Sequence, residues 1–199
     1  MPLRWSCGIG LVMVGLLSAE TVVAAEADWP CVQRRVVELS VAQMWAGPPI
    51  DPATSLWRDD QAVASLVRSL ASRRTSLEEA STAIERFSNA LGTDKDAKLA
   101  LLFAGVFELI NTERRRLING IERFARKQKS LADQISETGR ILAQSTNPTP
   151  ERIALEQKLQ WDTRIYDDRN QALTYVCESP VLLEQRVYAF GQEISRHLN

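Results

Sequence analysis

The most regular pattern of apolar residues in this chain lies between Asp94 and Gln144, a stretch without proline. Apolar side chains recur there at steps of mostly three and four residues, with one irregularity near Glu113. They are Leu99, Phe103, Val106, Ile110, Leu117, Ile121, Phe124, Leu131, Ile135 and Leu142. This spacing predicts a single amphipathic helix with a coiled-coil-like seam. At about 1.5 Å per residue such a helix is roughly 75 Å long, so we expect the rest of the chain to cover it and return along it.

The two halves of this predicted helix differ in how much of their surface is apolar. Between Ala97 and Ile110 nearly every side is apolar, and a helix of this kind must be surrounded by others. From Asn111 onward the apolar stripe narrows to about one residue per turn, which suits a helix with a single partner. The first half is therefore predicted to be a buried central helix, and the second half to pair with one returning helix.

Two shorter helices are predicted before the long one. The first runs from Thr54 to Ser72, with one apolar face made of Leu56, Val63, Leu66, Val67 and Leu70. The second starts at Thr75, because Glu78 follows at the spacing of a capping box. Its seam advances in steps of three and four residues through Leu77, Ala80, Ile84, Phe87 and Leu91. Gly92 is the expected stop, since glycine tolerates the left-handed backbone that often ends a helix.

A return helix is predicted after the turn at residues 145–150. Thr149 is a suitable N-cap, and Pro150 suits the first helical position. The apolar stripe of this helix consists of Leu155, Leu159, Tyr166, Leu173 and Cys177. A short loop makes the two helices antiparallel, with residue i of the long helix facing roughly residue 295 minus i of the return helix. Ser179-Pro180 repeats the pattern of a cap followed by proline, so a break or kink is expected there, with a last helix from Pro180 to Leu198.

The first residues of the chain predict an exported protein. Arg4, the short apolar run from Ile9 to Leu17 and the small residues Val23-Ala24-Ala25 form the pattern of a secretory signal peptide. The apolar run is too short to span a membrane, and Glu20 follows it. We therefore expect cleavage near Glu26, a periplasmic or secreted location, and no stable membrane anchor.

The segment from Asp28 to Gly47 follows neither the helical nor the strand period throughout. It is predicted to be an extended strap with one helical turn after Ser40, ended by two prolines that forbid regular hydrogen bonding. Trp45, just before them, has two interpretations. It is either part of a docking motif or a tryptophan packed on the helices and followed by a turn, and the second is favoured.

Together these elements predict an all-α fold. It consists of a four-helix head with a long antiparallel helical-hairpin, coiled-coil-like extension, and an N-terminal extended strap. The expected divisions are a signal peptide (1–25) and a single helical domain (26–199), made of the strap (26–50), the head (54–118 and 180–198) and the hairpin (119–177). A compact bundle, in which the chain folds back again, is the alternative.

Charge and cysteine content narrow the possible chemistry. The chain has 24 basic and 25 acidic residues, so no strong positive field predicts binding to nucleic acid. Removal of the signal peptide removes Cys7 and leaves Cys31 and Cys177, which predict a disulfide in an oxidising compartment. Two free buried thiols are the alternative. A metal or redox pair fits poorly, because the two cysteines are far apart in sequence and no histidine is near them.

Residues suited to catalysis are few. His197 is the only histidine, so it would have to serve any Ser-His-acid triad, and no GxSxG motif occurs. A single histidine cannot supply the two Glu-x-x-His motifs of a di-iron bundle. No glycine motif for phosphate or dinucleotide binding is present. We therefore predict no catalytic residue, no metal and no cofactor, and an enzyme is the least favoured class.

Seven positive charges in one part of the long helix form the most unusual charge feature. They are Arg114, Arg115, Arg116, Arg123, Arg126, Lys127 and Lys129. On one interpretation they have a structural role, pairing with Glu156, Asp162, Asp167, Asp168 and Glu178 of the return helix. On the other they form a docking face for an acidic partner or for an anionic polymer of the cell envelope, together with large amphipathic side chains of the kind enriched at interfaces. The partner-binding residues predicted on this second interpretation are Arg123, Arg126, Lys127, Lys129, Trp161 and Tyr166.

These observations favour a non-enzymatic, periplasmic, helical interaction or adaptor module, whose partner is a cell-envelope protein or another copy of the chain. The alternative is a periplasmic helical chaperone or small-ligand-binding protein. In that case the binding groove would be apolar and would be exposed by movement of the strap.

Overall fold

The structure is a computed structural model that describes residues 29–50, 56–144 and 146–199. All regular secondary structure in these ranges is helical, which confirms the all-α class. The elements are α1 (Val41–Met44), a 3₁₀ turn η1 (Leu56–Arg58), α2 (Gln61–Ala71), α3 (Leu77–Asn89), α4 (Lys95–Ala143) and α5 (Pro150–Ser195). The predicted signal peptide, residues 1–25, lies outside the described ranges.

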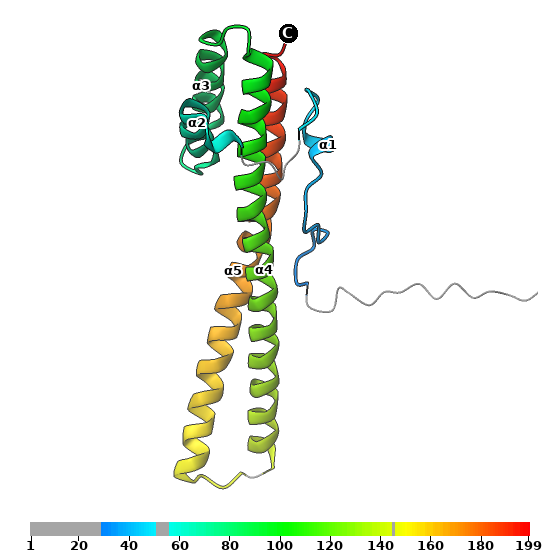
Figure 1. The fold of residues 1–199 in the computed structure, drawn as a ribbon. Coiled ribbons are helices and arrows are strands. Elements are labelled where there is room, and N and C mark those ends of the chain that lie inside the picture. The colour runs from blue at the N-terminus through cyan, green and yellow to red at the C-terminus, as the bar shows by residue number, and fades with distance from the viewer. Residues whose placement is uncertain (1–28, 51–55, 145) are drawn as a thin grey trace, which may run out of the picture.

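The two long helices α4 and α5 run antiparallel along the length of the molecule (Figure 1). Three side-chain to carbonyl hydrogen bonds define their register. They join Arg114 to Pro180, Gln128 to Tyr166, and Arg152 to Leu142. The residue numbers of each pair sum to 294, within one residue of the expected register. This register gives the height of any residue of α4 relative to α5.

Helix α5 continues through Pro180, so the expectation of a separate last helix was wrong. Proline has no N–H, and the carbonyl four residues before it therefore loses its helical donor. Neighbouring polar groups bind other carbonyls here: Ser179 Oγ donates to the carbonyl of Tyr175, and Arg114 Nε donates to that of Pro180. Cys177, Pro180 and Leu183 are buried on both sides of the interruption. Tertiary packing thus outweighs the local preference of proline for a helix start.

The beginnings of the short helices also differ from the expectation. Helix α2 starts only at Gln61, because the Asp60 side chain accepts hydrogen bonds from the N–H groups of Ala62 and Val63. Leu56 is consequently exposed in the preceding 3₁₀ turn, whereas Trp57 is buried. The capping box of α3 is formed by Ser76 and Glu79, one residue later than predicted.

The end of α3 does not use the predicted glycine stop. The helix ends at Asn89 with Ala90 as its C-cap, in the ordinary right-handed region. No described residue, Gly92 included, has the positive φ that such a stop would require. By contrast, the predicted cap of the return helix is correct, because Thr149 accepts a hydrogen bond from the N–H of Arg152 and Pro150 is the first helical residue.

The hydrophobic core surrounds the first half of α4, as its apolar composition predicts. Helix α2 packs mainly on α4 and α3 contacts α5, while the strap with α1 lies along the opposite side (Figure 1). The largest fully buried side chains are Phe103, Phe190, Leu70, Ile84, Leu99, Leu102, Ile110, Ile118, Ile121, Ile194, Val63 and Val67. Gly191 allows the strap to come close, since a Cβ there would lie 1.9 Å from the carbonyl oxygen of Met44.

This core does not extend to the turn of the hairpin. We call residues 122–143 of α4 and 150–176 of α5 the distal hairpin. No apolar side chain that the structure describes in these two ranges is buried. The seam residues Phe124, Leu131, Ile135, Leu155, Leu159 and Leu173 are only half-buried. Within the described ranges, no helix combines the length and apolar character needed to cross a membrane.

Candidate functional site

The three arginines at the top of the predicted cluster, Arg114, Arg115 and Arg116, all have partners within the described chain. Arg115 pairs with Glu38 of the strap at 3.0 Å, and Arg116 lies 3.8 Å from Glu113 on its own helix. Arg114 is buried between α4, α5 and the strap. These three arginines are therefore occupied by contacts within the chain.

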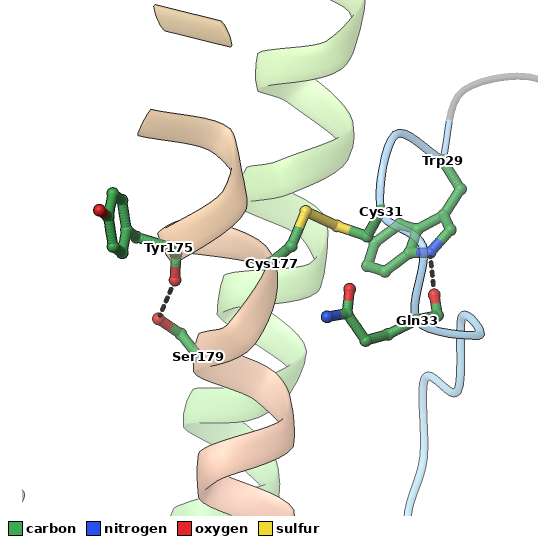
Figure 2. The surroundings of a disulfide bond; sticks show 6 residues. All are labelled: Trp29, Cys31, Gln33, Tyr175, Cys177 and Ser179. Atoms are coloured by element: carbon green, nitrogen blue, oxygen red, sulfur yellow. Dashed lines mark hydrogen bonds between the residues drawn. A yellow bond between two sulfur atoms is a disulfide. The ribbon is translucent and has the colours of Figure 1, made fainter. Parts of the chain in front are cut away.

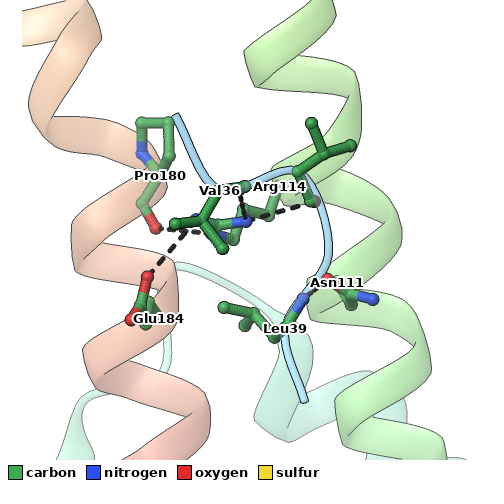
Figure 3. Close-up of polar contacts among 7 residues, drawn as sticks. Val36, Leu39, Asn111, Arg114, Pro180 and Glu184 are labelled. Carbon is green, nitrogen blue, oxygen red and sulfur yellow. Dashed lines mark hydrogen bonds and ion pairs between the residues drawn. The ribbon is translucent and has the colours of Figure 1, made fainter. Parts of the chain in front are cut away.

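Arg114 has the most complete set of contacts (Figure 3). Its guanidinium donates to the backbone carbonyls of Val36, Val37 and Pro180, and it lies 3.3 Å from a carboxylate oxygen of Glu184. Burial lowers the pKa of Arg114, and Glu184 acts in the opposite direction. Arginine nevertheless remains protonated at physiological pH, because its ordinary pKa is far above 7. The side chain thus supplies donors to the strap backbone in a place that water does not reach.

Asn111 performs a similar task one turn earlier on α4 (Figure 3). Its Oδ1 accepts a hydrogen bond from the N–H of Leu39 at 3.4 Å, and its Nδ2 donates to Glu38 at 2.8 Å. No strand among the described residues pairs with the strap, so its backbone groups need side-chain partners where they are buried. Polar residues of α4 supply them, which explains why this stretch of helix is not apolar.

The lower end of the strap is fixed by a disulfide between Cys31 and Cys177, as predicted (Figure 2). The Cα atoms are 5.6 Å apart, and the bond joins residues 146 positions apart in sequence. Trp29 Nε1 donates to the carbonyl of Gln33 at 2.6 Å, which closes the strap into a loop beside the bond. Arg35 pairs with Glu122, the first residue of the distal hairpin on α4, at 2.6 Å.

The remaining basic residues are exposed on the distal hairpin. Arg123, Arg126 and Lys127 form no hydrogen bond or ion pair with any residue the structure describes. Lys129 pairs with Asp133 on the same helix at 3.2 Å, where both side chains are largely exposed. We call Arg123, Arg126 and Lys127 the basic ridge.

The predicted pairing of this cluster with acidic residues of the return helix is not found. Glu156 and Asp162 pair instead with Arg152 and Lys158, both on α5 itself. Asp167, Asp168 and Glu178 are exposed and make no ion pair with a described residue. Glu156 and Asp162 lie one turn from Arg152 and Lys158 on the same helix, and Asp167, Asp168 and Glu178 occupy exposed positions of α5. The structural interpretation therefore holds for Arg114 alone, through Glu184, a residue that the prediction did not name.

Helix α5 carries a line of exposed large side chains on its outer face. Trp161 has 63% of its surface exposed, and Tyr175 and Leu182 follow on the same face, since their numbers differ by multiples of seven. The sequence analysis identified Trp161 but not Tyr175 or Leu182. Their seven-residue spacing, on the helix face opposite the inward apolar stripe, could have identified them. Between them, Asp167 and Asp168 line an open depression of about 550 Å³. Its other residues are Leu159, Gln160, Thr163 and Arg164.

The other predicted residues, Lys129 and Tyr166, lie in a separate pocket of about 320 Å³ beneath the start of the strap. The remaining lining residues are Trp29, Pro30, Ala125, Gln128, Asn170 and Leu173. Gln128 is buried, and its Nε2 donates to the carbonyl of Tyr166 at 3.1 Å. Its Oε1 is buried with no hydrogen-bond partner among the described residues. The six predicted residues thus fall into three groups: the basic ridge on α4, Trp161 on the outer face of α5, and Lys129 with Tyr166 in this pocket.

Other polar groups with shifted pKa values have structural partners. Hydrogen bonding by Arg58 lowers the pKa of Glu108, which also accepts a hydrogen bond from Trp57 Nε1 at 2.8 Å.

Trp45 is buried and stacks on Phe103 with ring centroids 4.6 Å apart, so the interpretation of Trp45 as a packed side chain is confirmed. In the part of the chain that the structure describes, no group of three or more His, Cys, Asp or Glu residues is placed to hold a metal ion.

Comparison with known proteins adds no further identification. A scan against protein-family models, a search of curated proteins and a search of solved structures each found no match to this chain.

Proposed function

We propose that this protein is a non-enzymatic interaction or adaptor module of the bacterial periplasm, and that it binds its partner through the distal hairpin. The observation that carries this proposal is the incomplete burial of that hairpin. Its apolar seam is half-buried, its basic ridge has no partner within the described chain, and Trp161 is exposed on the neighbouring helix.

The energetics of helices support this choice. Most of the stability of a helix in a protein comes from packing of its apolar face, not from intrinsic propensity. The distal hairpin continues for many residues beyond the last fully buried apolar contacts, at Ile121 and Cys177. Exposed apolar surface that a monomer does not cover is a common mark of an interaction site. A partner would supply the missing burial, and exposed tryptophan and arginine residues are the usual anchors of such contacts.

On this proposal the molecule divides into two functional parts. The short helices α2 and α3, with the adjoining ends of α4 and α5, act as a four-helix head that stabilises the chain. The distal hairpin acts as a coiled-coil-like arm that extends from this head. The head itself would need no exposed binding or catalytic residues.

The compartment is proposed from two independent features. The first residues of the sequence have the pattern of a secretory signal peptide. The disulfide between Cys31 and Cys177 is of a kind that persists in oxidising compartments such as the periplasm.

The test is capture of partners from a cell-envelope extract by the exported, disulfide-bonded protein. Alanine replacement of Arg123, Arg126, Lys127 and Lys129 together should abolish most of the capture and leave helicity and thermal stability nearly unchanged, because exposed charges contribute little to folding. A matched control replaces four basic residues outside the distal hairpin: Arg68, Arg74, Arg86 and Lys95. Unchanged capture by the first variant, or equal loss in the control, would contradict the proposal.

A second candidate function is binding of a small ligand, favoured by the pocket beneath Trp29. Gln128 Oε1 is buried there and has no hydrogen-bond partner among the described residues, so it would accept a hydrogen bond from such a ligand. Adding a small-molecule fraction of periplasmic extract to the protein should then change the fluorescence of Trp29. The change should be lost in Gln128→Leu and in Trp29→Phe. A response that survives both substitutions would exclude this pocket as its source.

A further inference from the structure

A pocket of about 360 Å³ lies between α5 and the connection that joins α2 to α3. This connection is at the end of the head nearer to the distal hairpin (Figure 1). The described residues that line the pocket are three leucines and four polar side chains: Leu77, Leu182, Leu183, Arg73, Ser179, Gln185 and Arg186. None of them is acidic, so the lining is apolar with positive charge beside it.

The three leucines give the pocket an apolar floor and exposed walls. Leu183 is buried in the hydrophobic core, whereas Leu77, the first residue of α3, and Leu182 are exposed. Pockets that bind small ligands begin at about 300 Å³. This pocket therefore has room for one large apolar side chain and the polar groups next to it, but not for a long acyl chain.

Arg186 is held in a fixed position at this pocket. Its Nε and Nη2 both donate to the carbonyl of Leu70, and Nη2 also donates to the carbonyls of Ser72 and Thr75. The guanidinium lies over the ring of Phe190, 4.8 Å from its centroid. Because these contacts already order the side chain, a ligand that binds Arg186 would not have to order it.

The charge of Arg186 has no carboxylate partner among the described residues. Burial lowers the pKa of Arg186 and no acidic group opposes this, whereas Glu184 does so at Arg114. The third nitrogen, Nη1, makes no hydrogen bond with a described residue, yet it is not one of the buried atoms that lack a partner. Nη1 is therefore accessible, and an anion placed there would form a charge-assisted hydrogen bond.

The neighbouring charges leave this end of the pocket positive. Arg73 pairs with Glu113 at 3.2 Å, so these two charges offset each other and that of Arg186 remains. The exposed carboxylates of Glu78 and Glu178 adjoin lining residues in sequence but are not among the residues that line the pocket. The site thus combines an apolar pocket with one ordered, unneutralised guanidinium.

We propose that this pocket binds the carboxyl terminus of a partner protein whose last residue is apolar, with the terminal carboxylate on Arg186 and the last side chain among the three leucines. A chain terminus carries both groups on one Cα, so both reach a small pocket at once. The exposed amide of Gln185 is available to the last peptide group. This site goes beyond the proposed function, which requires no binding residue in the head.

The first test is titration calorimetry of the exported, disulfide-bonded protein with the pentapeptide Gly-Ser-Gly-Ser-Leu. The free acid should bind, and the same peptide with a C-terminal amide should bind about tenfold or more weakly, because the charged hydrogen-bond partner of Arg186 is lost. A peptide that ends in aspartate should also bind about tenfold or more weakly, because a second carboxylate would be buried among leucines. Octanoate that binds as tightly as the free acid would overturn the choice of a chain terminus.

The second test changes exposed lining residues, because replacing Arg186 itself would also remove its contacts with the α2–α3 connection. Leu182→Ser removes an apolar wall and Gln185→Glu adds a negative charge, so each should weaken binding of the free acid about fivefold or more. The matched controls are Ile153→Ser and Gln171→Glu, at exposed positions of α5 outside the pocket. Each control should bind within about twofold of the wild type.

Three results would overturn this inference: no saturable binding of the free acid, equal affinity for acid and amide, or equal losses in the lining variants and their controls. The outcome is separate from that of the capture test. The variant without the four basic side chains of the distal hairpin should bind the peptide like the wild type, because none of them lines this pocket. If the peptide does not bind but capture depends on the basic ridge, only the present inference is overturned.

Discussion

Arg114 of α4 donates a hydrogen bond to the backbone carbonyl of Pro180 in α5 across 3.3 Å. The same guanidinium donates to the carbonyls of Val36 and Val37 in the strap. One side chain therefore joins three segments that are far apart in sequence. It does so at the place where proline interrupts the hydrogen bonding of α5 and just above the point where the buried core ends.

Replacing Arg114 by alanine should lower the free energy of unfolding by about 2–4 kcal/mol, because buried carbonyls of the strap lose charged donors. The matched control is Arg116→Ala, since that side chain is 76% exposed, and it should change stability by no more than about 0.5 kcal/mol. Urea unfolding of both variants checks this. Equal midpoints would show that the contacts of Arg114 do not stabilise the fold.

Gly191→Ala should destabilise the protein by about 1–3 kcal/mol through overpacking, because the added Cβ would meet the carbonyl oxygen of Met44. The control is Gly139→Ala in α4, where a Cβ meets nothing within 4 Å. There alanine should stabilise the helix by about 0.5–1 kcal/mol. Thermal unfolding should thus shift in opposite directions for the two substitutions. A shift in the same direction would mean that the strap does not approach α5 at Gly191.

The disulfide should contribute about 4–5 kcal/mol in the chain-entropy model, because it joins residues 146 positions apart. Replacing Cys31 and Cys177 together by serine should lower the urea midpoint and increase hydrogen exchange in residues 29–39. Thiol titration of the denatured, exported protein should find no free cysteine. Two titratable thiols, or equal stability of the serine variant, would contradict this prediction.

Acid should destabilise the fold through carboxylates whose pKa values are lowered. The main causes are the hydrogen bond from Arg58 for Glu108, that from Ser81 for Glu193, and the backbone N–H of Val63 for Asp60. A folded-state pKa below the unfolded value means that the unfolded chain binds the proton more tightly. The stability that these carboxylates contribute is therefore complete when the pH is above their ordinary pKa, 4.5 for glutamate. It is lost as the pH falls through their lowered pKa in the folded state.

Urea midpoints measured across this range should be flat near neutral pH and fall below about pH 4.5. The variant Glu108→Gln should be less stable at neutral pH and should lose less of its stability in acid. A wild-type midpoint that stays constant down to about pH 3 would contradict the assignment of these carboxylates.

Local patterns in the sequence predicted the features that depend on neighbouring residues. The extent of α4, the turn before Pro150 with its Thr149 cap, the helical turn after Ser40 and the disulfide were all correct. Helical spacing and capping act over a few residues, so they are visible without the fold. The errors at Thr75 and Gly92 were also local: the N-cap is the next residue, Ser76, and the helix ends before Gly92, at Asn89, with a right-handed C-cap at Ala90.

Which charges pair was decided by tertiary structure alone. Arg114 and Arg123 belong to the same basic cluster, yet one is buried among carbonyls and the other is exposed, with no partner among the residues that the structure describes. Sequence spacing gives the face of a helix, but not which neighbour covers that face. The same limit explains Trp57, Tyr175 and Leu182, whose burial or exposure depends on where α2, α3 and the strap end along the long helices.

The sequence by itself therefore determined the helical class, the extent of α4 and the antiparallel return after the turn before Pro150, because these follow from local geometry and chain connectivity. The tertiary structure decided that α5 continues through Pro180, that polar residues of α4 bind the strap, and that the apolar core stops at Ile121 and Cys177. The physical reason is that packing energy adds over many distant contacts. This packing energy can outweigh the preference of one proline to interrupt a helix. Where the distant contacts end, part of the helix surface stays exposed.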